Sequence, residues 1–314
     1  MFQLSHASIG QSLHCAGAEL SAGTGRDALA AQQVNVTGAV LLDEGFSAAG
    51  NVSLRGASIL RELRWEPGEP ATGEINLEGA RTQQLTDNWA DARALGYWPA
   101  GRLRLAGFTY DRFGGANPAT VSQRLDWIRS QYATPAMATM FATQPYKQLA
   151  EVYRRAGQDN EARAVEIAMR RDLRKRGNLP RPARYLNWLL DATIRYGFQT
   201  GRALVGLAAL YIIVFLAAFI AQHQGNLIAA TNVQNPGLHP TALHCVTGYP
   251  CFYPAGYAFD LVVPLINIHQ ADYWQANGHH WLGWAWVLGT WIATALGWFV
   301  ATLLVVGYTG LAQA

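Results

Sequence analysis

The sequence predicts a mixed protein: a cytoplasmic parallel β-helix, a helical hairpin that caps it, and a C-terminal module of two transmembrane helices. Three observations predict this fold class. A short motif with a Gly recurs five times before residue 118, and the apolar residues after it follow a helical period. Two long apolar segments after residue 202 contain no charged residue.

The repeated motif has apolar residues at its first and third positions, Gly at the fifth, and Ala or Phe at the sixth. Its copies begin at Leu13, Val34, Val52, Ile75 and Leu103, at intervals of 21, 18, 23 and 28 residues. Alternating apolar positions indicate one buried face of a strand, and Gly permits a tight turn. Stacked in one register, these units would form a β-helix over residues 1–117. An antiparallel sheet of hairpins is the alternative, but it does not require the same motif five times.

Two features of this region concern its loops and its first coil. The longer last intervals contain RELRWEPGEPATG and TDNWADARALGYWPAG, which we expect to be loops on one side of the β-helix. No evident cap precedes Ile9, so we expect a short N-terminal strand, another chain, or a longer solenoid of which this is a shortened version. The N-terminus lacks a positive region followed by an apolar core, so no cleavable signal peptide is expected.

Residues 118–177 are expected to form helices that cap the β-helix. Val121, Leu125 and Ile128 share one helical face, and the segment from Gln144 predicts two helices around a turn at residues 157–160. This pair resembles a single tetratricopeptide repeat, with matching residues at Leu149, Ala150, Tyr153, Gly157 and Ala162. Because Glu166 replaces a large apolar residue and the closing Pro is missing, we expect one packing hairpin and no peptide-binding array.

Residues 178–202 connect this hairpin to the membrane module. A basic run from Arg170 to Arg184 leads into this segment; 13 of the 24 Lys and Arg residues lie between Lys147 and Arg202, and none follows Arg202. Such a run stays on the cytoplasmic side and attracts anionic lipid head groups, although a solvated linker is the alternative. Aromatic residues are not interleaved with a basic face, so no nucleic-acid binding is expected.

The next segment carries an apolar stripe and interfacial aromatic residues. We expect a helix lying on the membrane surface, with a core helix as the alternative. The stripe contains Leu186, Leu189, Leu190, Ile194 and Phe198, and the aromatic residues are Tyr185, Trp188 and Tyr196.

Residues 203–222 predict the first transmembrane helix, and residues 223–280 predict an extracytoplasmic loop without Lys or Arg. In this loop Cys245 and Cys251 bracket VTGYP, and on the oxidising side such a pair can form a disulfide. The apolar segment around Pro264 is too short to span twice, so a re-entrant or interfacial helix is expected. Six histidines lie here without metal-ligand spacing, and we expect scattered interfacial residues and no metal site. These histidines are His223, His239, His244, His269, His279 and His280.

Residues 281–308 predict the second transmembrane helix, which would return the C-terminus to the cytoplasm. Small residues recur every fourth position at Ala285, Gly289, Ala293, Gly297 and Ala301. This small-residue strip permits another helix to approach closely. Its partner is either the first span or a second copy of the protein, and both alternatives remain open. Trp284, Trp291 and Trp298 recur on a different face.

Several segments together resemble a family of bacterial membrane proteins. These segments are Trp98 to Tyr110, Gln144 to Ala168, Trp188 to Gly197, and Tyr257 to Trp274. The family pairs pentapeptide-like β-helix coils with a two-span membrane module, and its members are often labelled membrane-associated oxidoreductases. The resemblance covers nearly the whole chain. It implies this fold and a bacterial inner-membrane location with both termini cytoplasmic, but it carries no catalytic motif onto numbered residues.

No enzymatic motif is found in the residues themselves. Gly23-Thr-Gly25-Arg-Asp-Ala28 is the only GxGxxA sequence, and it lacks the strand, turn and helix of a dinucleotide site. Cys15 is expected to face the interior as a small hydrophobic residue. We therefore expect no cofactor, and interpret the chain as a membrane-anchored scaffold or protein-interaction platform with an unknown protein partner. A membrane-associated oxidoreductase and an oligomeric pore, with selectivity near Asp260, are the alternatives.

Overall fold

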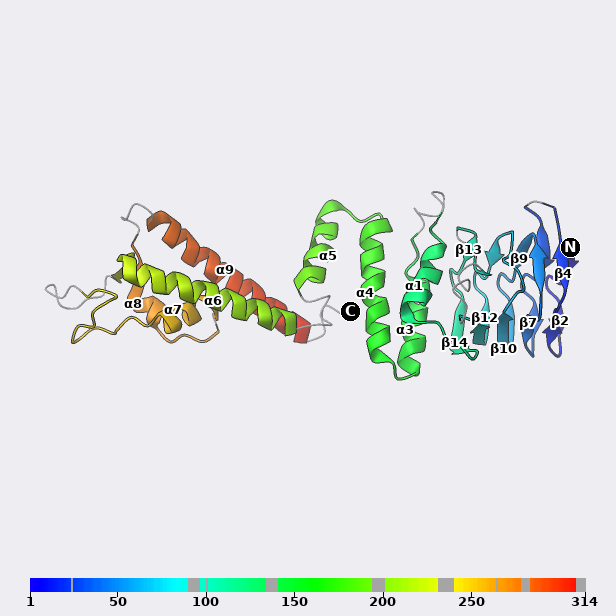
Figure 1. The fold of residues 1–314 in the computed structure, drawn as a ribbon, viewed down its shortest axis with the longest axis horizontal. Helices are drawn as coiled ribbons and strands as arrows, with labels where there is room; N and C mark the ends of the chain where they lie inside the picture. Colours follow the sequence, from blue (N-terminus) through cyan, green and yellow to red (C-terminus); the bar gives the residue numbers. More distant parts are fainter. Residues whose placement is uncertain are drawn as a thin grey trace. The chain divides into compact units, whose positions relative to one another are not determined.

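The computed structural model describes residues 1–23, 25–89, 97–99, 101–133, 141–193, 201–230, 240–263, 265–277 and 283–308. The chain divides into two compact units, Met1–Asn187 and Trp188–Ala314, which are described separately (Figure 1). Some predicted features lie outside the described residues: Pro264, the histidines at 239, 279 and 280, the end of the apolar stripe after residue 193, and the C-terminal tail.

The first unit begins with a parallel β-solenoid of about 4 turns, which confirms the predicted β-helix. One row of paired strands contains β1 (Phe2–Gln3), β5 (Asp27–Ala30), β9 (Asn51–Ser53), β11 (Ile75–Asn76) and β13 (Leu103–Arg104). A second row contains β2 (Ser8–Ile9), β6 (Asn35–Val36), β10 (Ser58–Trp65), β12 (Arg81–Asp87) and β14 (Thr109–Gly114). β3 (Leu13–His14) pairs with β7 (Val40–Leu42), and β4 (Glu19–Ser21) pairs with β8 (Ser47–Ala49).

The register of the coils differs from the predicted one. The aligned residues of the first row are Phe2, Leu29, Val52, Ile75 and Leu103, at spacings of 27, 23, 23 and 28 residues. Only the last three copies of the sequence motif therefore stack on one another. The first copy pairs through Leu13 with Val40, and the second pairs through Val36 with Ile59, so the prediction of five equivalent copies was wrong.

The reason for this error is one backbone position that recurs in every coil. Its residue adopts a positive φ in the four complete coils and in the partial last coil, in the order His6, Gln33, Gly56, Gly79 and Gly107. Gly tolerates this left-handed conformation without a steric cost, whereas other residues adopt it less readily. A motif that requires Gly at this position therefore detects the last three coils and misses the first two.

One predicted loop begins later than expected. Residues 61–65 of RELRWEPGEPATG belong to β10, where Leu63 pairs with Leu85 and Trp65 pairs with Asp87. The side chains alternate between buried and partly exposed positions, as a strand with one face on the interior requires. In the second predicted loop, Thr86 and Asp87 belong to β12, and residues 90–96 lie outside the described part of the chain.

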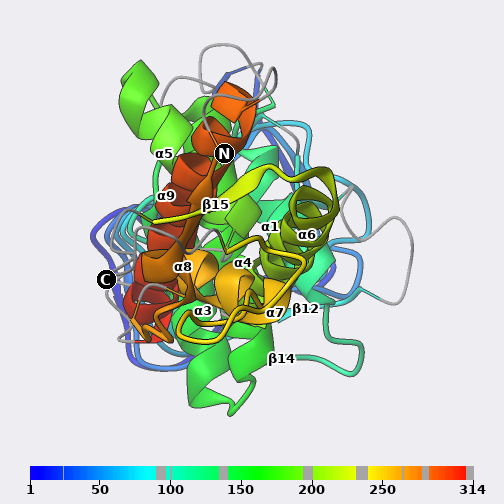
Figure 2. The ribbon, with the colours of Figure 1, turned by 90° about the vertical axis from the view of Figure 1, so that its left-hand side faces the viewer.

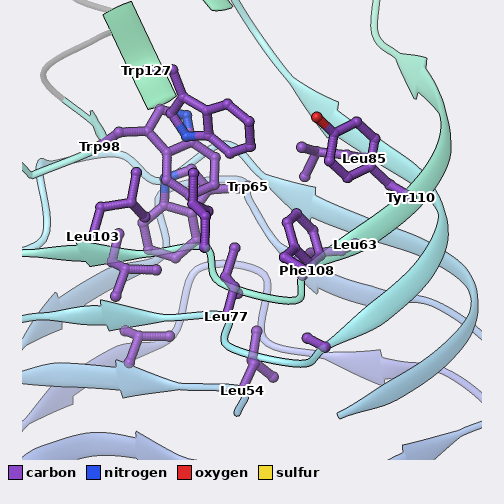
Figure 3. Close-up of a cluster of buried hydrophobic side chains, with 14 of the residues drawn as sticks. Leu54, Leu63, Trp65, Leu77, Leu85, Trp98, Leu103, Phe108, Tyr110 and Trp127 are labelled. Atoms are coloured by element: carbon purple, nitrogen blue, oxygen red, sulfur yellow. The ribbon is translucent and has the colours of Figure 1, made fainter. Parts of the chain in front are cut away.

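Apolar side chains fill the interior of the solenoid (Figure 3). Leu54, Leu77 and Leu105 come from successive coils and are almost fully buried. The ring centroids of Trp65 and Trp98 are 5.4 Å apart. Cys15 is buried, in agreement with its predicted inward position, and its thiol is free.

In the described part of the chain, the solenoid is followed by α1 (Val121–Ser130), α3 (Gln144–Arg155) and α4 (Asp159–Arg176), and α5 (Arg181–Thr193) continues into the second unit. The Thr120 side chain accepts a hydrogen bond from the Gln123 backbone at the start of α1, and Gln123 bonds back to the Thr120 amide, which makes a capping box. Gly157, with φ of 73°, lies in the turn between α3 and α4. Apolar residues of α1, α3 and α4 belong to the same buried cluster as the solenoid interior.

The second unit contains α6 (Gly201–Gln224), α7 (Pro254–Val262), α8 (Gln270–Tyr273) and α9 (Gly283–Tyr308). β15 (Leu227–Ala229) pairs antiparallel with β16 (Trp274–Ala276), a pairing that the sequence did not predict. Segments Leu204–Gln224 of α6 and Gly283–Val305 of α9 are long and apolar enough to cross a membrane. The shorter α7 packs beside both of these helices (Figures 1 and 2).

Candidate functional site

A groove of about 590 Å³ lies in the first unit, beside the last strand of the solenoid. We call it the solenoid-end groove. Phe113 of β14, Val121 of α1, and Val152 and Tyr153 of α3 contribute to its apolar lining. Asp111 also lines it, and its carboxylate forms a 2.8 Å ion pair with Arg155. A mostly apolar recess with a few polar groups is the usual form of a binding site.

Glycine residues allow the chain to form this groove. A Cβ atom on Gly114 would lie 2.2 Å from Gln84 Nε2 and 2.3 Å from Thr86 Oγ1, so a larger residue here would require these two side chains to shift. Gly115 follows with φ of 101°, a left-handed conformation that Gly adopts readily. The chain then turns into the capped start of α1, which places Val121 at the groove.

A buried ion pair lies under the groove. The Arg124 guanidinium binds Asp87 through two hydrogen bonds, Nη1 to Oδ2 at 2.7 Å and Nη2 to Oδ1 at 2.5 Å. Both side chains are at most 3% exposed. The guanidinium carbon also lies 3.9 Å from the centroid of the Phe113 ring. Because removal of either partner would leave a buried charge alone, this pair constrains α1 against the end of β12.

Tyr153 supplies a polar group beside the groove. Its hydroxyl is buried and has no hydrogen-bond partner among the described residues. Burial raises the pKa of Tyr153, against the opposing effect of the Arg124 charge, so the phenol stays neutral at physiological pH. A neutral phenol can donate or accept a hydrogen bond. Charged residues such as Asp111 and Arg155 also line the groove, so it suits a partner segment that has both apolar and charged groups.

Sequence reasoning missed this groove and its ion pair, although one signal was present. Arg124 lies three residues after Val121 and four before Ile128, on the helical face that the sequence predicted to be apolar. A charged residue on an apolar face requires a buried partner. The partner, Asp87, is 37 residues away and could not be identified from the sequence.

In the second unit, Cys245 and Cys251 form a disulfide with a Cα–Cα distance of 5.0 Å. The loop that it closes packs against β16. The indole of Trp274 donates a 3.2 Å hydrogen bond to the Pro250 carbonyl, and the rings of Tyr249 and Trp274 lie 5.4 Å apart. The disulfide therefore holds a loop that covers the buried Trp274 side chain.

The residues of the small-residue strip of α9 lie in different environments. Gly297 lies against α7, where an added Cβ would be 2.5 Å from the Val262 carbonyl oxygen. Ala293 is buried in a cluster with residues of α6 and α7. Gly289 has no atom within 4 Å of an added Cβ. The helix that contacts Gly297 is therefore α7. The sequence predicted only the first span or a second copy of the protein as the partner.

The remaining predicted features concern metal ligands, Asp260 and the GxGxxA sequence. No cluster of three His, Cys, Asp or Glu residues there could hold a metal ion. Asp260 accepts hydrogen bonds from the amides of Ile268 and Ala271, at 2.6 and 3.1 Å, so its carboxylate is used within the loop. Gly23 and Gly25 lie between β4 and β5 and precede a strand, whereas a dinucleotide fingerprint precedes a helix.

Comparisons of this chain with models of protein families, with curated proteins and with solved structures find no match.

Proposed function

We propose that this protein is a membrane-anchored platform, in which α6 and α9 span the bacterial inner membrane and the β-solenoid binds a protein partner at the cytoplasmic face. The two parts of this proposal are supported by different observations. The exposed surfaces of α6 and α9 support the anchor, and the solenoid-end groove supports the binding of a partner.

The observation that carries the anchor is the exposure of apolar side chains on α6 and α9. Val205 is 71% exposed, Ile213 is 64% exposed and Trp291 is 68% exposed. A long helix in the core of a soluble protein would bury such residues, whereas a lipid-facing helix leaves them on the surface. Trp284 and Trp298 are exposed as well. These surfaces are stable in contact with lipid and unfavourable in contact with water.

The orientation rests on charge. No Lys or Arg follows Arg202, and the basic run precedes α6, so the N-terminal end of α6 is the cytoplasmic end. In α5 the side chains of Tyr185, Leu186 and Trp188 are exposed, as an interfacial helix near anionic head groups requires. With two spans, both termini lie in the cytoplasm, where the solenoid meets its partner.

In this proposal α1, α3 and α4 cap the last coil of the solenoid. Polar side chains of α3 satisfy backbone groups at the edge of that coil. Gln148 Nε2 donates to the Tyr110 carbonyl at 2.6 Å, and Gln144 bonds both the Phe108 carbonyl and the Gly107 amide. A covered strand edge cannot pair with another chain. We propose the groove beside the cap as the site of partner binding.

The resemblance to bacterial pentapeptide-like membrane proteins agrees with this proposal but adds no site to it. For the oxidoreductase alternative, no residue set in the described part of the chain suggests a cofactor, and a bound flavin, haem or nicotinamide in the purified protein would favour it. For the pore alternative, neither span contains an Asp, Glu, Lys or Arg side chain after Arg202. We therefore propose the platform as the function.

The anchor is tested by extraction. Full-length protein in bacterial membranes should stay in the pellet at alkaline pH, as integral proteins do. An impermeant thiol reagent added outside, after reduction, should label Cys245 and Cys251 and leave Cys15 unlabelled. Release of the protein by alkali would refute the anchor, and labelling only after membrane disruption would refute the orientation.

The platform is tested by photo-crosslinking in cells. A photo-reactive amino acid at Val121, in the solenoid-end groove, should give a discrete cross-linked species. The matched control is the same amino acid at Leu60, which is exposed on β10 and is not part of the groove lining. Equal cross-linking at both positions, or none at Val121, would refute the groove as the partner site.

A further inference from the structure

A second groove lies within the membrane unit, between α6 and α9. Its volume is about 610 Å³, and α7 forms part of its lining. We call it the membrane groove. Val214 and Ala218 line it from α6, Gly289 and Ala293 from α9, and Leu261 from α7. No atom lies within 4 Å of an added Cβ at Gly289, so the two long helices are not in close contact there.

The length of the groove limits what it can hold. Its lining runs from Leu210 to Ala221 in α6 and from Ala285 to Leu296 in α9. Twelve residues of helix correspond to about 18 Å, a little more than half of the ~30 Å hydrocarbon core. Beyond this stretch Gly297 contacts α7, which closes the groove. The space therefore matches a lipid chain from one leaflet, whereas a transmembrane helix of a second copy is ~10 Å wide and needs the whole thickness.

A polar group is placed at one end of this apolar groove. Asn226, which is only 1% exposed, is among the residues that line it. Its Oδ1 atom has no hydrogen-bond partner among the described residues, whereas its Nδ2 donates to Gln224. An amide oxygen that is buried without a donor is unfavourable. A molecule in the groove that brings a donor to this end would remove that cost.

The backbone holds Asn226 at this position. Gly225, with φ of 69°, ends α6, and the Asn226 amide donates to the Ala221 carbonyl at 3.0 Å, as in a Schellman motif. The Asn226 carbonyl accepts a 2.8 Å hydrogen bond from the Asn277 amide. α6 has 24 residues, a length of about 36 Å, so its end reaches the level of the lipid head groups.

We propose that the membrane groove binds one neutral single-chain lipid of the monoacylglycerol type, with its acyl chain between α6 and α9 and a glycerol hydroxyl donating to Asn226 Oδ1. A neutral head group fits because no Lys or Arg follows Arg202, so this end of the unit offers no Lys or Arg side chain to a phosphate. This inference rests on the proposed membrane anchor.

The test is native mass spectrometry of the full-length protein in detergent, with three added probes that share one acyl chain. These are monooleoylglycerol, methyl oleate, which lacks a hydroxyl donor, and oleoyl lysophosphatidylglycerol, which is anionic. We expect a one-to-one complex with monooleoylglycerol, bound about tenfold more tightly than methyl oleate, the ratio that one buried hydrogen bond supplies. Binding of the anionic probe should be weaker than that of monooleoylglycerol.

Variants separate the contributions of the groove and of the amide. Gly289→Leu should fill the groove and abolish binding of all three probes, and Asn226→Leu should remove the preference for monooleoylglycerol over methyl oleate. Gly206→Leu, a matched change on α6 at a site with open space outside the groove, should change neither. Circular dichroism checks that each variant is folded.

Three results would overturn the inference: no complex, equal binding of monooleoylglycerol and methyl oleate to the unmodified protein, or a dimer that Gly289→Leu disrupts. Tighter binding of the anionic probe would overturn the neutral head group. Alkaline extraction, measured separately, distinguishes a failure of the membrane anchor from a failure of lipid binding. Extracted protein would refute the anchor and this inference together, whereas an integral protein without a lipid complex would refute only this inference.

Discussion

The buried pair of Arg124 and Asp87 gives the sharpest prediction from this structure. Asp87→Ala would leave the Arg124 guanidinium 1% exposed and without its carboxylate, enclosed by the rings of Phe113, Trp89 and Trp127. Breaking a buried pair in this way costs about 3–5 kcal/mol. Replacing both partners, as in Asp87→Ala with Arg124→Met, removes the isolated charge and should cost much less than the sum of the two single changes.

The assay is hydrogen–deuterium exchange of the full-length protein in detergent, followed for peptides from α1. Exchange reports local opening, so it does not require the two units to unfold together. A loss of 3 kcal/mol should speed exchange in α1 by more than about 100-fold. Exchange in α9 should not change in any of these variants.

The control is a second Arg to Met change at an exposed ion pair. Arg155, which pairs with Asp111, is 53% exposed, and Arg155→Met should cost less than about 1 kcal/mol. If Asp87→Ala and Arg155→Met change α1 exchange equally, the buried pair does not hold α1. If the double variant at positions 87 and 124 is as unstable as the sum of the single variants, the reasoning about an isolated charge is refuted.

Three further predictions concern other parts of the chain. Gly297→Ala should destabilise the second unit by about 1–3 kcal/mol in thermal unfolding, because the added Cβ would overlap the end of α7. The control Gly206→Ala should not destabilise it. Equal effects of the two changes would refute the close packing at Gly297. Replacing Cys245 and Cys251 by Ser should lower stability by about 2 kcal/mol, and alkylation of the native protein should gain these two thiols only after reduction. Burial, and then the charge of a neighbouring carboxylate, raise the pKa of Tyr146, so the folded state favours the neutral phenol. Its stabilising contribution is complete below about pH 10, the pKa of an unfolded Tyr, and is lost as pH rises above it. Absorbance titration should show this phenolate only as the protein unfolds, and ionisation of Tyr146 in folded protein would contradict the prediction.

The solenoid could be predicted from the sequence because a strand with one face on a narrow interior requires alternating apolar residues. The stacking of Val52, Ile75 and Leu103 followed from that alternation together with Gly at the left-handed position. The coils through Phe2 and Leu29 escaped prediction because His6 and Gln33 occupy that position with positive φ. A backbone conformation can be adopted by several residue types, so residue identity alone did not reveal the register.

The candidate sites were less predictable than the fold. The sequence showed Arg124 on an apolar face but gave no means of pairing it with Asp87, because that contact depends on how α1 packs against the last coils. The membrane groove depends on α7, a short helix whose apolar residues pack against both α6 and α9. Its depth and its polar end at Asn226 arise only when these helices are assembled.

Periodicity, charge and chain-breaking residues act locally, so the sequence by itself determined the solenoid class, the two apolar helices and the asymmetry of basic residues around Arg202. Tertiary structure decided the register of the coils, the pairing of Asp87 with Arg124, and the division of the α9 strip between α7 and open space. The physical reason is that these features depend on free-energy differences between alternative packings of distant segments. Such differences are summed over many contacts and are not encoded in any single stretch of residues.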